Sequence, residues 1–131
     1  MADKQAISTE RAPSAIGPYS QAIKSGNMVF LSGQIPLNPE TMEVVEGDIE
    51  AQARQVLDNL AAVAAEAGGT LDDCVKLTIY MIDLGHFAVV NTTMQQYFQT
   101  PYPARATIEV SALPRGVQVE IDAIMILPAT A

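Results

Sequence analysis

Two short segments near the end of the chain carry polar side chains of a kind that can do chemistry. Residues 103–110 (PARATIEV) and 117–124 (VQVEIDAI) flank a Pro-Arg-Gly turn. Each segment alternates polar with apolar residues, which is typical of a strand with one polar and one buried face. The polar positions are Arg105, Thr107 and Glu109 in the first segment, and Gln118, Glu120 and Asp122 in the second.

Arginine and glutamate on such strands have defined chemical uses. A guanidinium group stays charged at physiological pH and can donate two parallel hydrogen bonds to a carboxylate. A carboxylate of suitable pKa can pass protons between oxygen and nitrogen atoms. Arg105 and Glu120 are therefore candidate site residues, with Glu109 or Asp122 as the alternative, purely structural partners of Arg105.

Residue counts exclude several other kinds of site. His86 is the only histidine, which excludes histidine-rich metal sites and any catalytic set with two histidines. No glycine-rich phosphate loop is present. Cys74 lies in a strand pattern without a basic neighbour, and we interpret it as a small buried residue. We therefore expect no metal site.

The first third of the chain predicts a hairpin. Residues 19–24 and 28–32 are strand-like and flank Ser25-Gly26-Asn27, a sequence that suits a tight turn. A short edge strand is expected around Ile7. Two prolines in residues 33–41 cannot lie in a central strand, so we expect the backbone to leave the sheet at Ser32-Gly33. Gly33 would let a ligand or another chain approach the main chain closely.

The middle of the chain predicts two helices and a strand. Apolar residues from 49 to 67 follow a helical period, with Asp48 as N-cap and Gly68-Gly69 as the stop. A strand follows, in which Val75, Leu77, Ile79 and Met81 form the apolar face. A second helix, with apolar residues from Phe87 to Phe98, ends before Pro101. The order β-β-α-β-α-β-β predicts an α+β fold.

The two helices should lie on one face of the sheet, because crossover connections share one hand. Residues 28–31 and 123–127 are apolar on both sides, so the other face needs a cover and we infer a homo-oligomer. If Pro114-Arg115 formed a tight hairpin, Arg105 would oppose residue 124, about 13 Å from Glu120 along the strand. A bulge, a longer turn or two subunits could bring them together, and the sequence leaves these alternatives open.

Length and charge set broader limits. The 131 residues predict a single domain over residues 1–131. The formal net charge of −8 makes nucleic acid a poor partner. No apolar run approaches the ~20 residues that span a bilayer, and residues 1–5 are polar, so we expect neither a membrane segment nor a secretory signal. With its single cysteine, the chain is expected in the reducing cytoplasm.

Five blocks of this sequence resemble the Rid/YjgF family of reactive intermediate deaminases. They are IGPYSQAI (16–23), LSGQIPLNP (31–39), QARQVLDNL (52–60), PARATIEV (103–110) and LPRGVQVEIDAI (113–124). Each block alone would be a weak signal, but all five occur in the family's order. The resemblance runs from about Ala6 to Pro128.

The resemblance implies a chorismate-mutase-like α+β fold, with a mixed, mainly antiparallel sheet, assembled as a homotrimer with three clefts between subunits. It also implies cofactor-free hydrolysis of 2-imino acids to 2-keto acids and ammonia, as a 2-iminobutanoate/2-iminopropanoate deaminase. The imino acids would come from pyridoxal-phosphate enzymes that act on serine or threonine.

The family's site residues transfer to matching positions of this chain. Arg105 would bind the substrate carboxylate and Glu120 would position or activate water. Tyr19 and the Ser32-Gly33 main chain would line the cleft, and Asn91 would lie near its rim. Thr107 would be in the pocket wall, at a position where many relatives have Cys, which leaves substrate preference open.

Three other functions remain to be weighed against the deaminase. The same clefts could bind or sense 2-keto acids or other small carboxylates without turnover. RNA cleavage or inhibition of translation, reported for some relatives, is disfavoured by the charge of −8. A redox-switched holdase would need surface chemistry that the sequence does not show.

Overall fold

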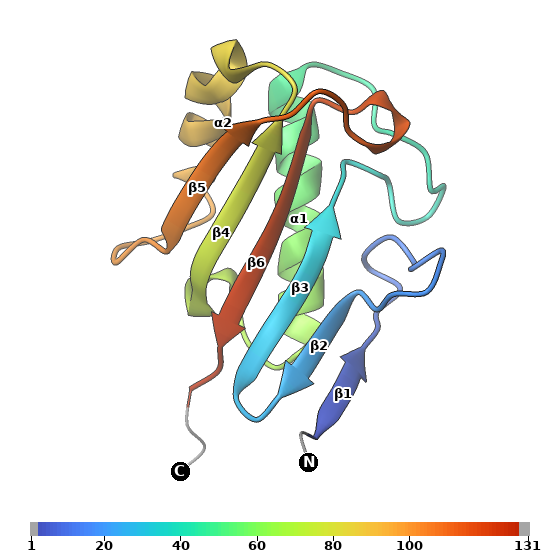
Figure 1. Cartoon of the computed structure of the whole chain (residues 1–131), viewed down its shortest axis with the longest axis vertical. Coiled ribbons are helices and arrows are strands. Elements are labelled where there is room, and N and C mark those ends of the chain that lie inside the picture. Colours follow the sequence, from blue (N-terminus) through green and yellow to red (C-terminus); the bar gives the residue numbers. More distant parts are fainter. Residues whose placement is uncertain (1–2, 129–131) are drawn as a thin grey trace.

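The computed structural model describes residues 3–128 as a six-stranded sheet with two α-helices on one side (Figure 1). The strands are β1 (Lys4–Ile7), β2 (Ala22–Ser25), β3 (Met28–Gln34), β4 (Cys74–Met81), β5 (Ala104–Glu109) and β6 (Val119–Ile126). The helices are α1 (Ile49–Glu66) and α2 (Phe87–Met94), with short 3-10 turns η1 (Leu71–Asp73), η2 (Leu84–His86) and η3 (Pro114–Gly116). The predicted α+β class is confirmed.

The sheet has the strand order β1-β2-β3-β6-β4-β5. All neighbouring strands are antiparallel except β4 and β5, which are parallel, so the sheet is mixed and mainly antiparallel as predicted. Strand β4 lies between β5 and β6. A tight hairpin between β5 and β6 is therefore not formed, and that possible geometry for Arg105 and Glu120 is wrong.

Helix α1 begins and ends where the sequence predicts. The Asp48 side chain accepts a hydrogen bond from the backbone N–H of Ala51, and the helix ends just before Gly68. Gly68 has a φ of +100°, a backbone conformation that favours glycine. The second helix is shorter than expected, because α2 ends at Met94 and residues 95–97 form turns.

The two faces of the sheet have different surroundings. Buried side chains on alternate positions of β3, β4 and β6 pack against α1, and α2 packs beside α1 on the same side (Figure 1). We call this side the helix face. The opposite, open face carries Met28, Phe30, Ile108 and Ile126, each 38–44% exposed. The expected uncovered apolar face is therefore present.

Strand β5 corrects the predicted pattern of burial. Arg105 pairs with Leu77 of β4, whose side chain is fully buried on the helix face, so the polar positions of β5 point towards the helices. Ala106 and Ile108 lie on the open face instead of in the core. The predicted alternation of polar and apolar residues along β5 is present. The polar face is the one turned towards the helices, because α2 leaves a hollow next to this edge strand.

Two smaller expectations also change. Strand β3 continues through Ser32 and Gly33 to Gln34, with a register irregularity between Leu31 and Gln34, so the backbone leaves the sheet later than expected. Val75 is 42% exposed while Cys74 is buried, because the pairing of β4 with β6 is irregular between Cys74 and Lys76.

Over residues 3–128, no helix has both the length and the apolarity that crossing a membrane requires.

Candidate functional site

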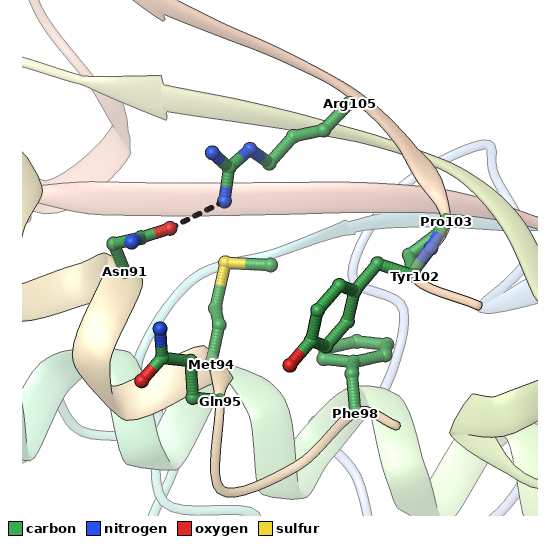
Figure 2. Close-up of a pocket in the computed structure, with 7 residues that line it drawn as sticks. All are labelled: Asn91, Met94, Gln95, Phe98, Tyr102, Pro103 and Arg105. Carbon is green, nitrogen blue, oxygen red and sulfur yellow. Dashed lines mark hydrogen bonds between the residues drawn. The ribbon is translucent and has the colours of Figure 1, made fainter. Parts of the chain in front are cut away.

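A hollow next to Arg105 opens between α2 and the start of β5 (Figure 2). We call it the Arg105 hollow, and its volume is about 410 Å³. It is lined by Asn91, Met94, Gln95, Phe98, Tyr102, Pro103 and Arg105. Buried Met94 and Phe98 form apolar lining, while Arg105, Asn91 and Gln95 contribute polar groups. The hollow can therefore hold a small molecule that has both an anionic and an apolar part.

The Arg105 guanidinium is held by two contacts. Its Nη1 donates a hydrogen bond of 2.7 Å to Oδ1 of Asn91, which Figure 2 shows across the hollow. Its central carbon lies 5.0 Å from the centre of the Phe87 ring, within the range of a cation–π contact. These contacts leave further N–H groups of the planar fork for a ligand. The arrangement suits a carboxylate.

A second hollow lies around Glu120. This Glu120 hollow has a volume of about 340 Å³. Tyr19, Gly33 and Glu120 line it together with Pro13, Ser14, Ile16, Gln21, Gln34, Ile35, Leu37, Met42, Pro114 and Arg115. Its lining comes from the segments before β2, after β3 and around η3. Three predicted residues are thus brought together here.

Gly33 allows the Glu120 side chain to lie directly against the main chain of β3. A Cβ atom at position 33 would collide with the Glu120 carboxylate. Burial, and then the nearby charge of Asp122, raises the pKa of the Glu120 carboxyl above its ordinary value. The Ser32 hydroxyl donates to the backbone carbonyl of Ser20, which fixes the main chain next to Gly33. The protonated form of Glu120 is therefore more favourable here than for a glutamate in water.

Buried carboxamides hold the loops around the Glu120 hollow. Gln21 Nε2 donates to the carbonyls of Ala12 and Pro13, at 3.3 and 2.7 Å. Asn59 Nδ2, from α1, donates to the Leu37 carbonyl at 3.0 Å. Oε1 of Gln52, also from α1, accepts a hydrogen bond of 2.9 Å from the Gln118 backbone N–H. These three side chains tie the lining to the core.

The two hollows lie apart in one chain. Arg105 pairs across the sheet with Leu77, whereas Glu120 pairs with Tyr80, three residues further along β4. This offset corresponds to about 10 Å along the strand. Glu120 alternates with buried Val119 and Ile121, so its side chain is on the open face, opposite Arg105. A single chain therefore does not bring Arg105 and Glu120 together.

The seven predicted site residues divide between these places. Asn91 and Arg105 share the Arg105 hollow, and Thr107 is half-buried on the same face of β5, outside the hollow's lining. Tyr19, Gly33 and Glu120 share the Glu120 hollow, with Ser32 next to it in the chain. Phe87, Met94, Gln95 and Phe98 were not predicted as site residues. They lie three, four or seven residues from the predicted residue Asn91, and this helical spacing could have identified them.

No cysteine lines the Arg105 hollow or the Glu120 hollow. Cys74 is buried, as interpreted from the sequence, and burial raises the pKa of its thiol to about 12. The thiol is therefore un-ionised at neutral pH and a poor nucleophile. Within residues 3–128, no cluster of three or more histidine, cysteine, aspartate or glutamate side chains has the geometry to hold a metal ion.

Comparison with known proteins identifies the family. Residues 9–127 match the family model described as endoribonuclease L-PSP, which is the Rid/YjgF family. A match over most of the chain shows membership, so the chain belongs to this family and the resemblance found in the sequence is confirmed.

Several relatives are similar over nearly their whole length. Protein DfrA of Myxococcus xanthus is 55% identical over 125 residues, which cover 94% of this chain and 95% of the relative. The 2-iminobutanoate/2-iminopropanoate deaminase of Escherichia coli K12 is 49% identical over 123 residues, covering 92% and 95%. The crystal structure of E. coli TdcF with bound serine has a TM-score of 0.90 and 42% identity, covering 95% of this chain and 99% of that one.

Proposed function

We propose that this protein hydrolyses reactive 2-imino acids to 2-keto acids and ammonia. The observation that carries the proposal is the division of the site: a preset guanidinium at Arg105 and a half-buried carboxyl at Glu120 lie in separate hollows. A homotrimer with clefts between subunits would place Arg105 of one copy near Glu120 of a neighbouring copy. The uncovered apolar face of the sheet supports such an assembly. The deaminase name of the E. coli relative supports the reaction.

Arg105 would bind and orient the substrate through its carboxylate. A 2-imino acid has a planar carboxylate bonded to the electrophilic C=N carbon, and the guanidinium fork can donate two hydrogen bonds to it. Asn91 and Phe87 already hold the guanidinium, so little side-chain entropy is lost when the substrate binds. Serine, bound to the relative TdcF, also has a carboxylate on the carbon next to its nitrogen atom.

Glu120 would move the protons. As a carboxylate it takes a proton from a water molecule while the water oxygen bonds to the C=N carbon, and it returns this proton to the nitrogen atom. From the resulting carbinolamine it takes the hydroxyl proton and passes it to the nitrogen atom, so that the C–N bond breaks, ammonia leaves and the C=O bond of the 2-keto acid forms. One water is consumed and no electrons are transferred, so the reaction needs no cofactor. A raised pKa suits a group that both accepts and donates a proton.

The other predicted residues would shape the cleft. Tyr19 and the Ser32-Gly33 main chain would line it beside Glu120, and Thr107 would contribute to the wall near Arg105. Gly33 would have a second role, because it leaves room for the Glu120 carboxylate. We place the reaction in the cytoplasm, a proposal that rests on the single, buried Cys74.

A coupled assay tests this function. 2-Iminopropanoate and 2-iminobutanoate would be generated in situ, and keto-acid release would be measured with wild-type protein and with Arg105→Ala. We expect acceleration by the wild type and its loss in the variant. Light scattering should give the mass of a trimer, and a monomer would contradict the shared cleft. A folded trimer that does not accelerate imine decay would contradict the deaminase proposal.

Binding without turnover is the second candidate function. The Arg105 hollow favours it, because the guanidinium is preset for a carboxylate without any contribution from Glu120. Calorimetric binding of 2-ketobutyrate, together with an unchanged rate of imine decay, would support a sensing module. RNA remains a poor candidate ligand, since the net charge of −8 repels polyanions.

A further inference from the structure

Two carboxylates on the open face of β6 have different partners. The Tyr80 hydroxyl donates a hydrogen bond of 2.9 Å to Oδ2 of Asp122. Within residues 3–128, the Glu120 carboxylate has neither a hydrogen bond nor an ion pair. The hydrogen bond from Tyr80 therefore fixes the position of the Asp122 carboxylate, whereas the Glu120 carboxyl has no such partner.

Tyr80 forms a hydrogen bond with one of the two carboxylates and not with the other. Tyr80 is the cross-strand partner of Glu120, yet its hydroxyl reaches diagonally to Asp122, the residue two further along β6. Side chains two residues apart on one strand face are about 6.6 Å apart. The Asp122 charge is thus close enough to act on Glu120, and after burial it is the second cause that raises the pKa of Glu120.

Among the residues of one chain that line the Glu120 hollow, Glu120 is the only carboxylic acid and Arg115 is the only cation. β3 contributes the Gly33 main chain, and the segment before β2 contributes Tyr19. Arg115 of η3 also lines the Glu120 hollow, but its Nη1 donates to the Met42 carbonyl at 2.8 Å. Two neighbouring carboxyl groups with different surroundings are a common feature of acid–base sites.

We propose that Tyr80 and Asp122 are positioning residues for Glu120. The Tyr80 hydroxyl holds the Asp122 carboxylate in place on the open face of β6, and the negative charge fixed there makes Glu120 the carboxyl that accepts and returns the proton during imine hydrolysis. This inference rests on the proposed function. It adds a role for two residues that lie outside the lining of both hollows.

The direct test is to titrate Glu120 in the intact protein. NMR of ¹³C-labelled glutamate side chains, assigned with Glu120→Gln, would follow its carboxyl resonance in wild type and in Asp122→Asn. We expect the midpoint to move to lower pH by about half a unit to one unit, because a like charge has been removed. The acid limb of the kcat/KM profile for 2-iminobutanoate should move in the same direction.

Tyr80→Phe tests the role of the Tyr80 hydroxyl. Without the hydroxyl donor, the Asp122 carboxylate is no longer held in place beside Glu120, so the Glu120 midpoint should move in the same direction by a smaller amount. Asp72→Asn is the charge-matched control, since it removes one carboxylate from η1, at the other end of β4 from Tyr80. That control should leave both the midpoint and the pH profile unchanged.

The outcomes separate this inference from the proposed function. An unmoved Glu120 midpoint in Asp122→Asn, or a uniform loss of activity without a shift of the acid limb, would overturn the inference while the deaminase stands. If wild-type protein did not hydrolyse imines, the proposed function would fail. The NMR midpoints would then still decide whether Tyr80 and Asp122 control the protonation of Glu120.

Discussion

The charged groups of the two hollows have opposite surroundings. In the Arg105 hollow the guanidinium already has two partners, the side-chain oxygen Oδ1 of Asn91 and the Phe87 ring. In the Glu120 hollow the carboxyl is half-buried, without a hydrogen-bond donor in residues 3–128, and beside another negative charge. In the proposed mechanism the first arrangement would bind the substrate's carboxylate and the second would exchange a proton. Binding and proton transfer would then lie on different faces of one sheet.

Removing the exchangeable proton should have the largest effect. Glu120→Gln keeps the size of the side chain but cannot accept a proton, so we expect kcat for 2-iminobutanoate to fall by about 10²- to 10⁴-fold. Affinity for 2-ketobutyrate should change far less. Glu109→Gln is the matched control, because Glu109 Oε1 accepts a hydrogen bond from the Leu84 backbone N–H and glutamine can also accept it. Equal losses in kcat and affinity would contradict the division of roles.

Weakening the anion-binding hollow should come next. Arg105→Lys replaces a planar fork by a point charge, and we expect kcat/KM to fall about 100-fold, as for the loss of one hydrogen bond to a charged group. Steady-state kinetics would measure this change. Arg115→Lys is the control, since a lysine can still donate to the Met42 carbonyl. Near-normal kinetics of Arg105→Lys would remove Arg105 from carboxylate binding.

A methyl group at Gly33 should disturb the Glu120 hollow indirectly. Gly33→Ala would displace the Glu120 carboxylate, and we expect a loss of about 10-fold in kcat, because a misplaced proton-transfer group is less effective. The substitution should cause no further loss of kcat in the Glu120→Gln background. If the two losses were independent, Gly33 would act by some route other than Glu120.

The smallest expected effect is on stability. The raised pKa of Glu120 means that folding favours its protonated form, so the ionised carboxylate destabilises the fold as the pH rises above the usual range of a glutamate. Glu120→Gln should therefore be more stable than wild type at pH 7, by less than about 1 kcal/mol because solvent screens the half-exposed group. The gain should vanish below about pH 4. Thermal unfolding at fixed protein concentration would measure it.

The sequence predicted the elements better than their arrangement. Helical spacing with caps at Asp48 and Gly68 located α1, since these signals are local. The exchange of neighbours in the sheet, which inserts β4 between β5 and β6, depends on contacts between distant segments and leaves no local signal. For the same reason, alternation in β5 identified two faces but could not tell which one faces the helices.

The candidate site was predicted in part for similar reasons. The family resemblance provided Arg105, Glu120 and the residues around them, but not their separation onto opposite faces. Phe87 was overlooked because its contact with Arg105 joins a helix to a strand 18 positions away. The Tyr80–Asp122 hydrogen bond joins residues 42 positions apart and depends on the pairing of β4 with β6.

The buried carboxamides have a consequence for how ionic strength acts on this protein. Gln21, Asn59 and Gln52 are neutral, so added salt does not screen the hydrogen bonds with which they hold the loops of the Glu120 hollow. The shape of that hollow should be the same in dilute buffer and in concentrated salt. A salt dependence of kcat/KM would then report the electrostatic interaction between the substrate and the charges of the protein, which in the proposed mechanism include Arg105.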